Sequence, residues 1–482
     1  MELERLIAAL APSDVVRRAP AKVHDLAYDA RRVRSGSLFF CVPGMRADGH
    51  DFAPQAVASG AVALVVERPL DLPVPQLVVS DSRAAMGAAA AEFFDHPTRE
   101  LLVAGVTGTN GKTTACYLLH GILEAAGLRP GLVGTVESRV GNERRTALRT
   151  TPEAIDLQRT FREMLGAGNR SCAMEATSHG SELKRLAGTR FRALVFTNLG
   201  QDHLDFHGTL ERYFEAKRRL FLTGERPPAA VNVGDAHGRR LVEELSGLGH
   251  EQLLTFGFAD DADVRPERLE LTRSGARFRA AGIDLETRLL GRFNVENALG
   301  AVAAARLLGL PDEAVAAGAA GVAGVPGRFE PVDEGQPFTV IVDFAHTPDS
   351  LESALRAARD LAEGRVLCVF GCGGDRDRGK RPLMGRIASE VADLAIVTSD
   401  NPRSEDPEEI VREILTGVAR EVQVEPDRRA AIARAVEAAR PGDVVVIAGK
   451  GHEQGQEADG RTIPFDDRKV AREALRRLGA RA

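Results

Sequence analysis

Short apolar runs and polar, glycine-containing segments alternate along most of this chain. Between residues 101 and 200 the runs "LLVAGV" (101–106), "SCAMEA" (171–176) and "ALVFTNL" (193–199) are almost continuously apolar. Such runs are typical of parallel strands that are covered on both faces. "NVENALGAVAAARLLG" (294–309) is rich in Ala and Leu and predicts a helix. The pattern therefore predicts an α/β fold in this part of the chain.

The same alternation returns after residue 330. "FTVIVDFAH" (338–346), "RVLCVFGCGG" (365–374), "ADLAIVTSDNP" (392–402) and "GDVVVIAGKGHE" (442–453) each lead from an apolar run into a polar loop. In open parallel sheets, ligands bind beyond the carboxyl ends of the strands, and the polar segments gather where that rule places a site. "VAGVPGRFE" (322–330), rich in Gly and Pro, predicts a linker between two α/β domains.

A smaller α/β unit precedes residue 98. Its apolar runs are "GSLFFCVPG" (36–44), "GAVALVVE" (60–67) and "PQLVVSD" (75–81), with the helix-like "APQAVASG" (53–60) among them. "DHPTRE" (95–100) has turn composition, and we place a domain boundary there.

Composition narrows the class of protein. The 482 residues predict two to four domains at about 100–200 residues each. Trp is absent, Tyr is scarce and the net charge is -6, so we expect no nucleic-acid partner. No apolar run is long enough to span a membrane, and the N-terminus lacks the pattern of a signal peptide. The five scattered cysteines suit no disulfide framework, and we expect a cytoplasmic location.

"TGTNGKTT" (107–114) lies between a strand-like run and a helix-like segment, which is the context of a phosphate loop. Glycines let backbone N–H groups turn toward phosphate oxygens, and the helix N-terminus adds a favourable dipole. Lys112 can contact the terminal phosphates, and a threonine hydroxyl can bind Mg²⁺. The spacing departs from the standard motif, since Val106 stands where the first glycine is usual. The alternative is an ordinary strand–turn–helix connection.

Two further strand exits carry candidate metal ligands. "CAMEATSHG" holds Glu175 and His179, and "TNLGQDHLDFHG" holds Asp202, His203, Asp205 and His207. Acidic and histidine side chains beside a triphosphate suit a divalent cation, and oxygen ligands favour Mg²⁺. Zinc held by His203 and His207 and a solvated polar loop are the alternatives. Read from its surroundings alone, Lys217 would be an exposed helix lysine.

Eight motifs together give a resemblance that covers essentially the whole chain. In order they are "TGTNGKTT", "AMEATSHG", "TNLGQDHLDFHGTLERYFEAK", "GRFNVENALGA", "VDFAHTPDSLE", "GCGGDRDRGKRPLMG", "SDNPRSEDP" and "AGKGHE". In order and spacing they resemble the Mur ligase family. The resemblance implies three domains: a small α/β domain for the UDP-linked substrate (1–98), a central phosphate-loop ATPase-like parallel sheet (99–327) and a C-terminal Rossmann-like domain for the amino acid (328–482).

The resemblance also implies a reaction. ATP, with Mg²⁺, would phosphorylate a carboxylate of UDP-N-acetylmuramoyl-L-alanyl-D-glutamate, and the amine of meso-2,6-diaminopimelate would displace the phosphate. The γ-phosphate turns a poor leaving group into a good one, and positioning and charge neutralisation supply most of the rate. The protein would then be a monomer in peptidoglycan synthesis, and its partners would be these small-molecule substrates.

By resemblance, the residues of the nucleotide and metal sites can be assigned one by one. Lys112 and Thr113 would serve the phosphates and Mg²⁺. Glu175 and His203 would be metal ligands, and Lys217 matches a lysine that is carbamylated in the family, which turns a cation into an anionic oxygen ligand. Arg328 matches a hinge arginine that faces the phosphates. The remaining residues assigned to ATP are Thr107, Gly108, Thr109, Asn110, Gly111, Asn294, Asn297 and Asp343, with His346 beside the ribose and phosphate.

The segment "DNPR" resembles the family's signature for diaminopimelate. Diaminopimelate differs from lysine by a second carboxylate, which Arg403 can bind in a bidentate manner. Glu453 can pair with the distal ammonium. An exposed loop charge is the alternative for Arg403. The assigned amino-acid contacts are Arg376, Asp400, Asn401, Pro402, Arg403, Gly449 and Glu453.

The assignment for the UDP-linked substrate includes two departures from the family pattern. Ala30 stands where the family often has Ser, and Leu183 stands where Gln is common, so the fine contacts differ here. A simple surface turn is the alternative for the loop at 45–47. The assigned residues are Tyr28, Ala30, Met45, Arg46, Ala47, Thr150, Thr151, Thr177 and Arg185.

Three other functions are weighed against this one. A lysine-adding ligase would usually lack Arg at position 403, and a folylpolyglutamate synthetase would not need the N-terminal domain. An inactive protein that only keeps the fold would have no need of Lys112, Lys217 and Arg403.

Overall fold

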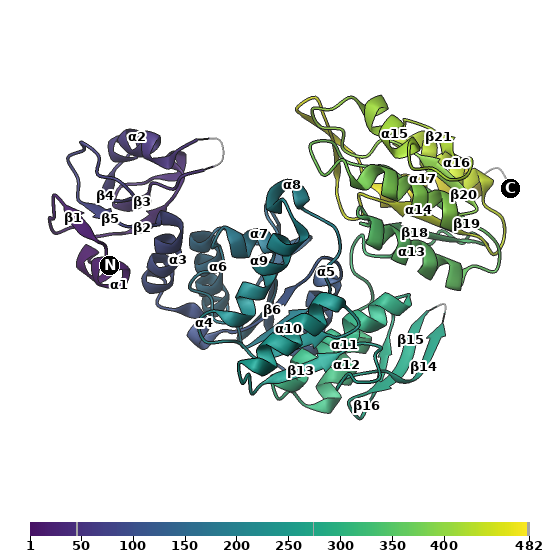
Figure 1. The fold of residues 1–482 in the computed structure, drawn as a ribbon, viewed down its shortest axis with the longest axis horizontal. Helices are drawn as coiled ribbons and strands as arrows, with labels where there is room; N and C mark the ends of the chain where they lie inside the picture. Colours follow the sequence, from purple (N-terminus) through teal and green to yellow (C-terminus); the bar gives the residue numbers. More distant parts are fainter. Residues whose placement is uncertain (45–46, 273, 480–482) are drawn as a thin grey trace. The chain divides into compact units, whose positions relative to one another are not determined.

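The computed structural model describes residues 1–44, 47–272 and 274–479 (Figure 1). The chain divides into two compact units, which are described separately. The first contains Met1–Gly105, Leu128–Leu194 and Arg219–Pro227. The second contains Val106–Gly127, Val195–Arg218 and Pro228–Ala482.

The N-terminal part is a five-stranded sheet with helices on both faces. Its strand order is β1-β5-β4-β3-β2, and only β1 runs antiparallel to its neighbour. Side chains alternate across β3, so Leu38 and Phe40 pack toward α1 and α3 while Phe39 packs toward α2. The elements are α1 (Leu3–Leu10), β1 (Asp14–Val16), β2 (Asp25–Ala27), η1 (Ala30–Arg32), β3 (Ser37–Phe40), η2 (Gly49–Phe52), α2 (Ala53–Ala58), β4 (Ala61–Val66), β5 (Gln76–Val78) and α3 (Ser82–Phe93).

The segment predicted as a turn at 95–100 is in part helical. Asp95 and His96 have positive φ and stop α3, and Pro97 then begins the one-turn helix α4 (Pro97–Glu100). Proline favours this position because a first helical residue needs no N–H donor.

The central sheet has eight strands in the order β13-β12-β11-β6-β10-β7-β8-β9. β10 pairs with β7, and β12 with β13, in parallel, while β8 and β9 add an antiparallel edge. Helices α11 and α12 pack against α5. The strands are β6 (Leu102–Thr107), β7 (Pro130–Val133), β8 (Glu137–Val140), β9 (Glu143–Thr146), β10 (Ser171–Glu175), β11 (Ala193–Phe196), β12 (Ala229–Asn232) and β13 (Leu253–Phe256). The helices are α5 (Lys112–Ala125), α6 (Ala154–Gly166), α7 (Ser178–Glu182), α8 (Leu204–His207), α9 (Leu210–Leu222), α10 (Ala236–Gly247), α11 (Arg292–Leu307) and α12 (Asp312–Gly321).

A separate antiparallel sheet, β14-β15-β16, precedes α11. Its strands are β14 (Glu267–Thr272), β15 (Gly275–Ala280) and β16 (Ile283–Thr287). In the segment predicted as a linker (322–330), no helix or strand lies between α12 and β17 (Glu330–Val332), while both of its sides belong to the second compact unit.

The C-terminal sheet has the order β17-β18-β22-β19-β20-β21 and is parallel except at β17. A two-stranded hairpin, β23 and β24, follows it. The strands are β18 (Thr339–Asp343), β19 (Val366–Phe370), β20 (Leu394–Val397), β21 (Gln423–Val424), β22 (Val444–Ala448), β23 (Gly455–Ala458) and β24 (Arg461–Pro464). The helices are α13 (Pro348–Leu361), α14 (Lys380–Val391), α15 (Pro407–Leu415), α16 (Arg428–Ala438) and α17 (Asp467–Gly479).

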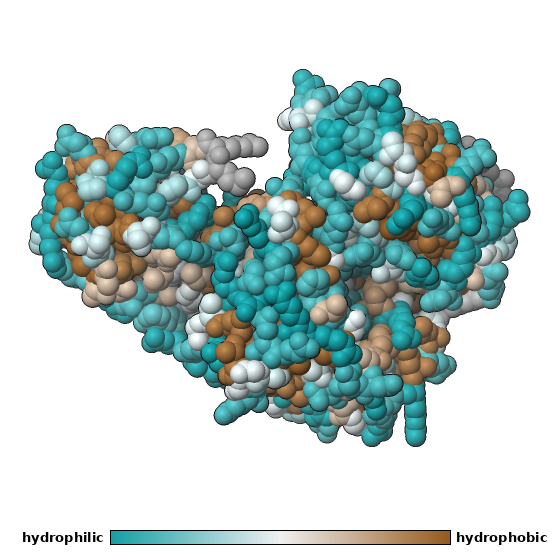
Figure 2. All heavy atoms as spheres, viewed as in Figure 1, coloured by the Kyte–Doolittle hydropathy of each residue, from teal (hydrophilic) through white to brown (hydrophobic). Residues whose placement is uncertain are grey.

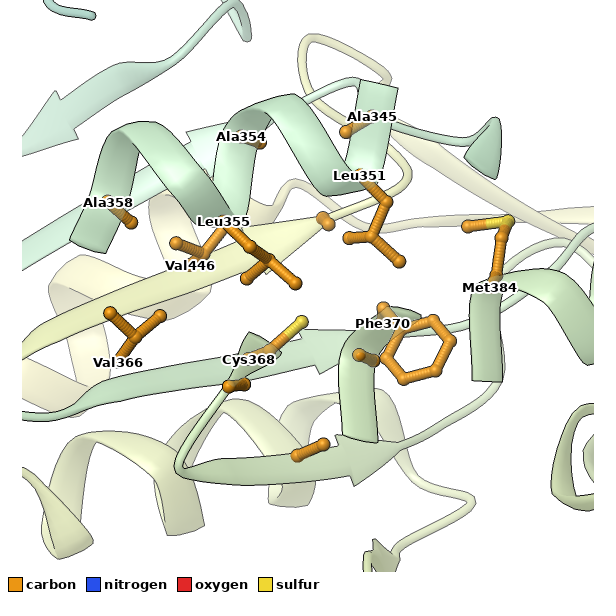
Figure 3. Packing of buried hydrophobic residues seen from close by; sticks show 14 of the residues in the cluster. Ala345, Leu351, Ala354, Leu355, Ala358, Val366, Cys368, Phe370, Met384 and Val446 are labelled. Atoms are coloured by element: carbon orange, nitrogen blue, oxygen red, sulfur yellow. The ribbon is translucent and has the colours of Figure 1, made fainter. Parts of the chain in front are cut away.

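The period of two along β19 separates two cores. Cys368 and Phe370 pack with Leu351 and Leu355 of α13, and with Met384 of α14 (Figure 3). The intervening residues of β19 pack on the opposite face, against α16 and α17. Burial on both faces explains why these strands are continuous apolar runs, and the predicted α/β class is confirmed.

Figure 2 shows hydrophilic residues over much of the visible surface, with hydrophobic residues between them. In the described parts of the chain, no helix is long and apolar enough to cross a membrane.

Candidate functional site

The loop between β6 and α5 has the backbone that the glycines predict. Gly108 and Gly111 have φ values of 145° and 85°, which other residues rarely adopt. A Cβ atom at Gly108 would lie 1.8 Å from Thr197 Oγ1, and one at Gly111 would lie 2.1 Å from Asn297 Oδ1. A side chain at either position would therefore displace these atoms and strain the backbone.

Hydrogen bonds from the strand exit of β11 fix the same loop. The N–H groups of Thr109 and Asn110 donate to the backbone and side-chain oxygens of Asn198, both at 2.9 Å. Thr197 Oγ1 donates to the Asn110 carbonyl at 2.6 Å. Thr107, which ends β6, is fully buried. Hydrogen bonds to the segment after β11 therefore fix the conformation of this loop.

Two lysines point at the carbonyl oxygens of this loop. Lys112 Nζ donates to Gly108 O at 3.0 Å and to Thr109 O at 2.6 Å. Lys217 Nζ, from α9, donates to Gly108 O at 2.7 Å and lies 4.4 Å from the centre of the Tyr213 ring. Tyr213 OH lies 3.2 Å from Thr109 Oγ1, so Lys217 and Tyr213 both connect α9 to the loop.

Lys217 is not the exposed helix lysine that its local sequence indicates. It is 1% exposed. Burial, and then the positive charge of Lys112, lower its pKa well below the ordinary 10.5. A lowered pKa favours the neutral, nucleophilic amine over the charged ammonium.

Arg328 reaches the first turn of α5. Its Nη2 atom donates to Thr113 Oγ1 at 3.0 Å, and its guanidinium lies 4.4 Å from the centre of the Phe344 ring. Asp343, at the end of β18, accepts N–H bonds from Phe329 and Ala345 at 2.5 and 2.8 Å. Burial raises the pKa of Asp343 to about 6, against the opposing charge of Arg328.

Asn294 and Asn297 lie on one buried turn of α11. Asn297 Nδ2 donates to Asn294 Oδ1 at 3.0 Å, and Asn294 Nδ2 donates to the Leu290 carbonyl at 2.8 Å. Because Asn297 also faces Gly111, the structure brings this pair to the phosphate loop.

Asp202 lies close to histidines from two segments. His203 Nε2 and His346 Nε2 lie 3.4 and 3.8 Å from its Oδ2. Burial alone would raise the pKa of Asp202, but the charges of His203, His346 and Lys380 outweigh that effect and lower it. Loss of solvent, and then the charge of Lys380, lower the pKa of His346 to about 4, so this imidazole is neutral at neutral pH.

The predicted ligands of a divalent cation come from separate elements: Thr113 from α5, Glu175 from β10 and Lys217 from α9, with His203 just before α8. Among the described residues, no group of three His, Cys, Asp or Glu side chains can hold a metal ion. His203 has positive φ and precedes the single-turn helix α8, whereas His207 is buried against Tyr213. The zinc alternative therefore lacks support, while the Thr113 hydroxyl and a carbamylated Lys217 would be hard oxygen donors that suit Mg²⁺.

Glu175 ends β10 in the other compact unit, where threonines surround it. The N–H and Oγ1 of Thr135 donate to its two carboxylate oxygens at 2.7 and 3.0 Å. Thr135 also lies 3.1 Å from Thr150 through their Oγ1 atoms, and Thr151 Oγ1 donates to the Glu175 carbonyl at 2.8 Å. Thr177 Oγ1 bonds to Thr151 Oγ1 at 2.9 Å. The structure thus brings together four of the predicted residues.

Arginines lie beside this threonine group. Arg185 Nη1 donates to the Thr151 carbonyl at 3.3 Å, and its Nε lies 3.0 Å from Glu153 Oε1. Glu153 is buried and also pairs with Arg83 and Arg149. One buried carboxylate among three guanidiniums leaves an excess of positive charge, which suits an anionic substrate.

The other contacts assigned to the UDP-linked substrate lie nearer the N-terminus. Tyr28 OH donates to Asp156 Oδ2 at 2.5 Å, and burial raises its pKa. Ala30 is buried at the start of η1 and can donate no side-chain hydrogen bond. Ala47 is exposed. Met45 and Arg46 lie outside the described residues.

The loop after β20 and the loop after β22 form one hydrogen-bonded cluster. Lys450 Nζ, which is fully buried, donates to Asn401 Oδ1 at 2.8 Å and to Glu453 Oε2 at 3.1 Å. Asn401 Nδ2 donates to the same Glu453 oxygen at 2.8 Å. A Cβ at Gly449 would lie 2.4 Å from Asp400 Oδ2.

Arg403 lies at the edge of this cluster in a left-handed conformation, with φ of 55°. Its Nε donates to Glu457 Oε2 at 2.9 Å and its Nη1 to the Gly374 carbonyl at 2.8 Å. Pro402 is buried, and Arg376 Nη1 donates to the Asp375 carbonyl at 3.0 Å. An exposed, unstructured charge is therefore the wrong description of Arg403.

Sequence reasoning missed Lys380, Lys450 and Arg428. Lys380 is 4% exposed, and Lys450 and Arg428 are almost fully buried. Arg428 Nε and Nη2 donate to the two oxygens of Asp467 at 2.8 and 2.7 Å, and Nη2 also donates to the Ala448 carbonyl at 2.9 Å. The sequence feature that could have identified Lys380 and Lys450 is their position next to glycines, in segments that follow strands.

A glycine-rich phosphate loop in a parallel α/β sheet is the arrangement of proteins that bind nucleoside phosphates. Family models confirm the class and extend it. The "Mur ligase family, catalytic domain" matches residues 22–105, the "Mur ligase middle domain" matches 106–305, and the "Mur ligase, glutamate ligase domain" matches 327–451. The chain belongs to the Mur ligase family.

Individual relatives are similar over nearly the full length. The UDP-N-acetylmuramoyl-L-alanyl-D-glutamate–2,6-diaminopimelate ligase of Geobacillus kaustophilus (strain HTA426) is 48% identical over 467 residues, which is 94% of this chain and 95% of that protein. The protein of the same name from Solibacter usitatus (strain Ellin6076) is 47% identical over 473 residues, covering 96% and 95%. A solved structure with that name is 34% identical and covers 95% of both chains, with a TM-score of 0.68.

Proposed function

We propose that this chain is an ATP-dependent, ADP-forming amide ligase. It joins meso-2,6-diaminopimelate to UDP-N-acetylmuramoyl-L-alanyl-D-glutamate in the synthesis of peptidoglycan. The names and full-length similarity of the relatives support this proposal. The observation that carries it is the phosphate loop, whose carbonyl oxygens accept hydrogen bonds from two lysines and whose Thr113 accepts one from Arg328.

The proposed reaction has two steps. A carboxylate oxygen of the glutamate residue attacks the γ-phosphorus of ATP, the bond to the β-phosphate oxygen breaks, and ADP leaves. The free amine of diaminopimelate then attacks the acyl carbon, and the tetrahedral intermediate expels phosphate. The amine proton is lost, and the products are the amide, ADP and phosphate.

Positively charged residues of the site would neutralise the phosphates. Lys112 donates to a loop carbonyl, Arg328 donates to Thr113 in the first turn of α5, and α5 adds its N-terminal dipole. Asn294, Asn297 and Asp343 would bind the adenosine part. Nδ1 of His346 donates to the Phe344 carbonyl at 2.7 Å, so in the neutral ring Nε2 can accept a hydrogen bond beside the transferred group.

Magnesium would bind to oxygens of Thr113, Glu175 and a carbamylated Lys217, with His203, and would offset negative charge on the phosphates. Lys217 suits this modification because its amine is buried and its pKa is low. The neutral nitrogen attacks the carbon of CO₂, loses a proton and leaves an anionic carbamate.

The substrates would occupy three domains at 1–98, 99–327 and 328–482. The threonines around Glu175, with Arg185, would receive the sugar-linked peptide, together with Tyr28 and the 45–47 loop. The cluster formed by Arg376, the 400–403 loop, Gly449 and Glu453 would receive diaminopimelate. We expect a monomer that works in the cytoplasm, where ATP and UDP-linked precursors are made.

Phosphate release with purified protein tests this function. Release should require ATP, Mg²⁺, the UDP-linked dipeptide and diaminopimelate together, and mass spectrometry should find the tripeptide product. Omission of either co-substrate is the control. Phosphate release that does not require the amino acid, or faster use of lysine than of diaminopimelate, would overturn the proposal.

A further inference from the structure

A carboxylate of the protein's own hairpin holds the arginine assigned to the amino-acid substrate. Glu457 lies on β23, and its Oε2 accepts a 2.9 Å hydrogen bond from Arg403 Nε. Arg403 Nη1 donates to the Gly374 carbonyl at 2.8 Å from another loop. The guanidinium is therefore fixed by two different segments.

Backbone hydrogen bonds dock the hairpin on the arginine loop. Arg403 N–H donates to Glu457 O at 3.0 Å, and Asp459 N–H donates to Arg403 O at 2.8 Å. Glu457 N–H donates to Asn401 Oδ1 at 3.0 Å, and Gln456 Nε2 donates to Asp400 O at 2.8 Å. These bonds hold Arg403 in its left-handed conformation and place the Glu457 side chain beside it.

The remaining N–H groups of Arg403 suit a second carboxylate. A guanidinium has five N–H donors, and a bidentate carboxylate uses two of them. The bonds to Glu457 and Gly374 use Nε and one Nη1 donor, so N–H donors remain on both terminal nitrogens. Because a fixed fork loses little entropy on binding, a guanidinium held in this way binds a carboxylate better than a mobile one.

We propose that Glu457 is a specificity-determining residue that holds the Arg403 guanidinium with its terminal N–H groups available for the second carboxylate of the amino-acid substrate. Glu457 acts through Arg403 and is a positioning residue. The inference rests on the proposed diaminopimelate-adding function and names a residue of that site beyond the assigned contacts.

The opposite role would be competition, with Glu457 occupying the place of the substrate carboxylate. The geometry favours positioning, because only Nε is engaged and the Glu457 side chain is 51% exposed, so water screens its repulsion of a second anion. The two roles predict opposite changes in KM.

The test compares Glu457→Ala, Glu457→Gln and the control Asp459→Asn. The control removes a charge two residues away, is exposed and leaves the backbone bond to Arg403 intact. We expect Glu457→Ala to raise KM for diaminopimelate about tenfold, the effect of about 1.4 kcal/mol, with KM for ATP unchanged. Glu457→Gln keeps an oxygen acceptor and should retain most of the affinity, and the control should match the wild type.

Lysine, which lacks the second carboxylate, separates positioning from general damage. With lysine as substrate at high concentration, Glu457→Ala should keep the wild-type kcat/KM, so the preference for diaminopimelate falls about tenfold. In an Arg403→Ala background, Glu457→Ala should have no further effect, as a double-mutant cycle requires.

Three results would overturn the inference. They are an unchanged or lowered KM for diaminopimelate in Glu457→Ala, an equal loss with lysine, and an equal effect in the Arg403→Ala background. If the wild-type protein used neither amino acid, the proposed function itself would fail and the inference would fall with it.

Discussion

Lys217 Nζ donates a 2.7 Å hydrogen bond to the carbonyl oxygen of Gly108 in the phosphate loop. The lysine is buried, and its pKa is well below the ordinary value because charge is costly there and Lys112 is close. A charged ammonium would be disfavoured at this place, whereas a neutral amine can react with CO₂.

Replacement of Lys217 by alanine should therefore reduce kcat on the order of 100-fold, the scale of a lost electrostatic stabiliser. A small carboxylate such as formate should restore part of the activity, because it can supply the missing anionic oxygens. Intact-protein mass and phosphate release measure the modification and the rescue. Full activity of Lys217→Ala without added carboxylate would refute the carbamate assignment.

Gly111→Ala should lower kcat/KM for ATP by more than its loss of folding stability accounts for. The new Cβ would lie 2.1 Å from Asn297 Oδ1, and φ is 85°. Gly127→Ala is a matched control with φ of 73° and open space around its Cβ. Both should cost about 1–2 kcal/mol through the left-handed backbone. Only Gly111→Ala should also lower kcat/KM for ATP by about 100-fold, since its clash displaces the loop. Equal ATP kinetics in the two variants would contradict the steric argument.

Arg403→Ala should weaken use of diaminopimelate and leave ATP almost unaffected. Loss of a charged hydrogen-bond donor costs about 1.5–3 kcal/mol, which raises KM about 10- to 100-fold. Arg461→Ala, exposed on β24, is the control for loss of a nearby positive charge. Steady-state kinetics with each substrate varied in turn provides the measurement. An unchanged KM for diaminopimelate would remove Arg403 from the site.

Asp343 makes a specific prediction for pH. Its pKa is raised from 3.8 to about 6, so the folded protein holds a proton there that the unfolded chain releases. Its contribution to stability is greatest below pH 3.8 and is lost as pH rises to about 6. Asp343→Asn should therefore gain up to about 3 kcal/mol relative to the wild type across this interval. Urea unfolding of both proteins at several pH values tests the sign, and a pH-independent difference would show that the pKa is not raised.

The buried pair of Arg428 and Asp467 should be costly to break from one side. Both side chains are 0% exposed and joined by two hydrogen bonds. Arg428→Met leaves an uncompensated carboxylate and should lower the free energy of unfolding by about 3–5 kcal/mol. The double variant with Asp467→Leu should recover most of that loss. Similar unfolding curves for the single and double variants would argue against this explanation.

The part of the site that is continuous in the sequence, the phosphate loop, could be predicted from the sequence. The phosphate loop needs glycines, a lysine and threonines next to one another between a strand and a helix, and its local sequence carries all of this information. Gly108 and Gly111 indeed adopt the backbone that only glycine adopts easily. The two faces of β19 likewise follow from its continuous apolar run.

Burial of charged residues could not be predicted in the same way. Lys450 is buried because Asn401 and Glu453 supply oxygens from other positions, and Lys217 because α9 packs against the Gly108 loop. A lysine in a helix reads as exposed until its distant partners are known. The helical turn at 97–100 was missed because turn and helix-start residues are the same types.

The pairing of β23 with the 400–403 loop has a consequence for how this protein can change. Main-chain amides and carbonyls make that pairing, and every amino acid except proline supplies both groups. Position 457 can thus accept new side chains while the hairpin stays docked. Substitutions at this position, natural or engineered, can therefore change which amino acid is added to the cell-wall precursor without changing the residues that bind the nucleotide.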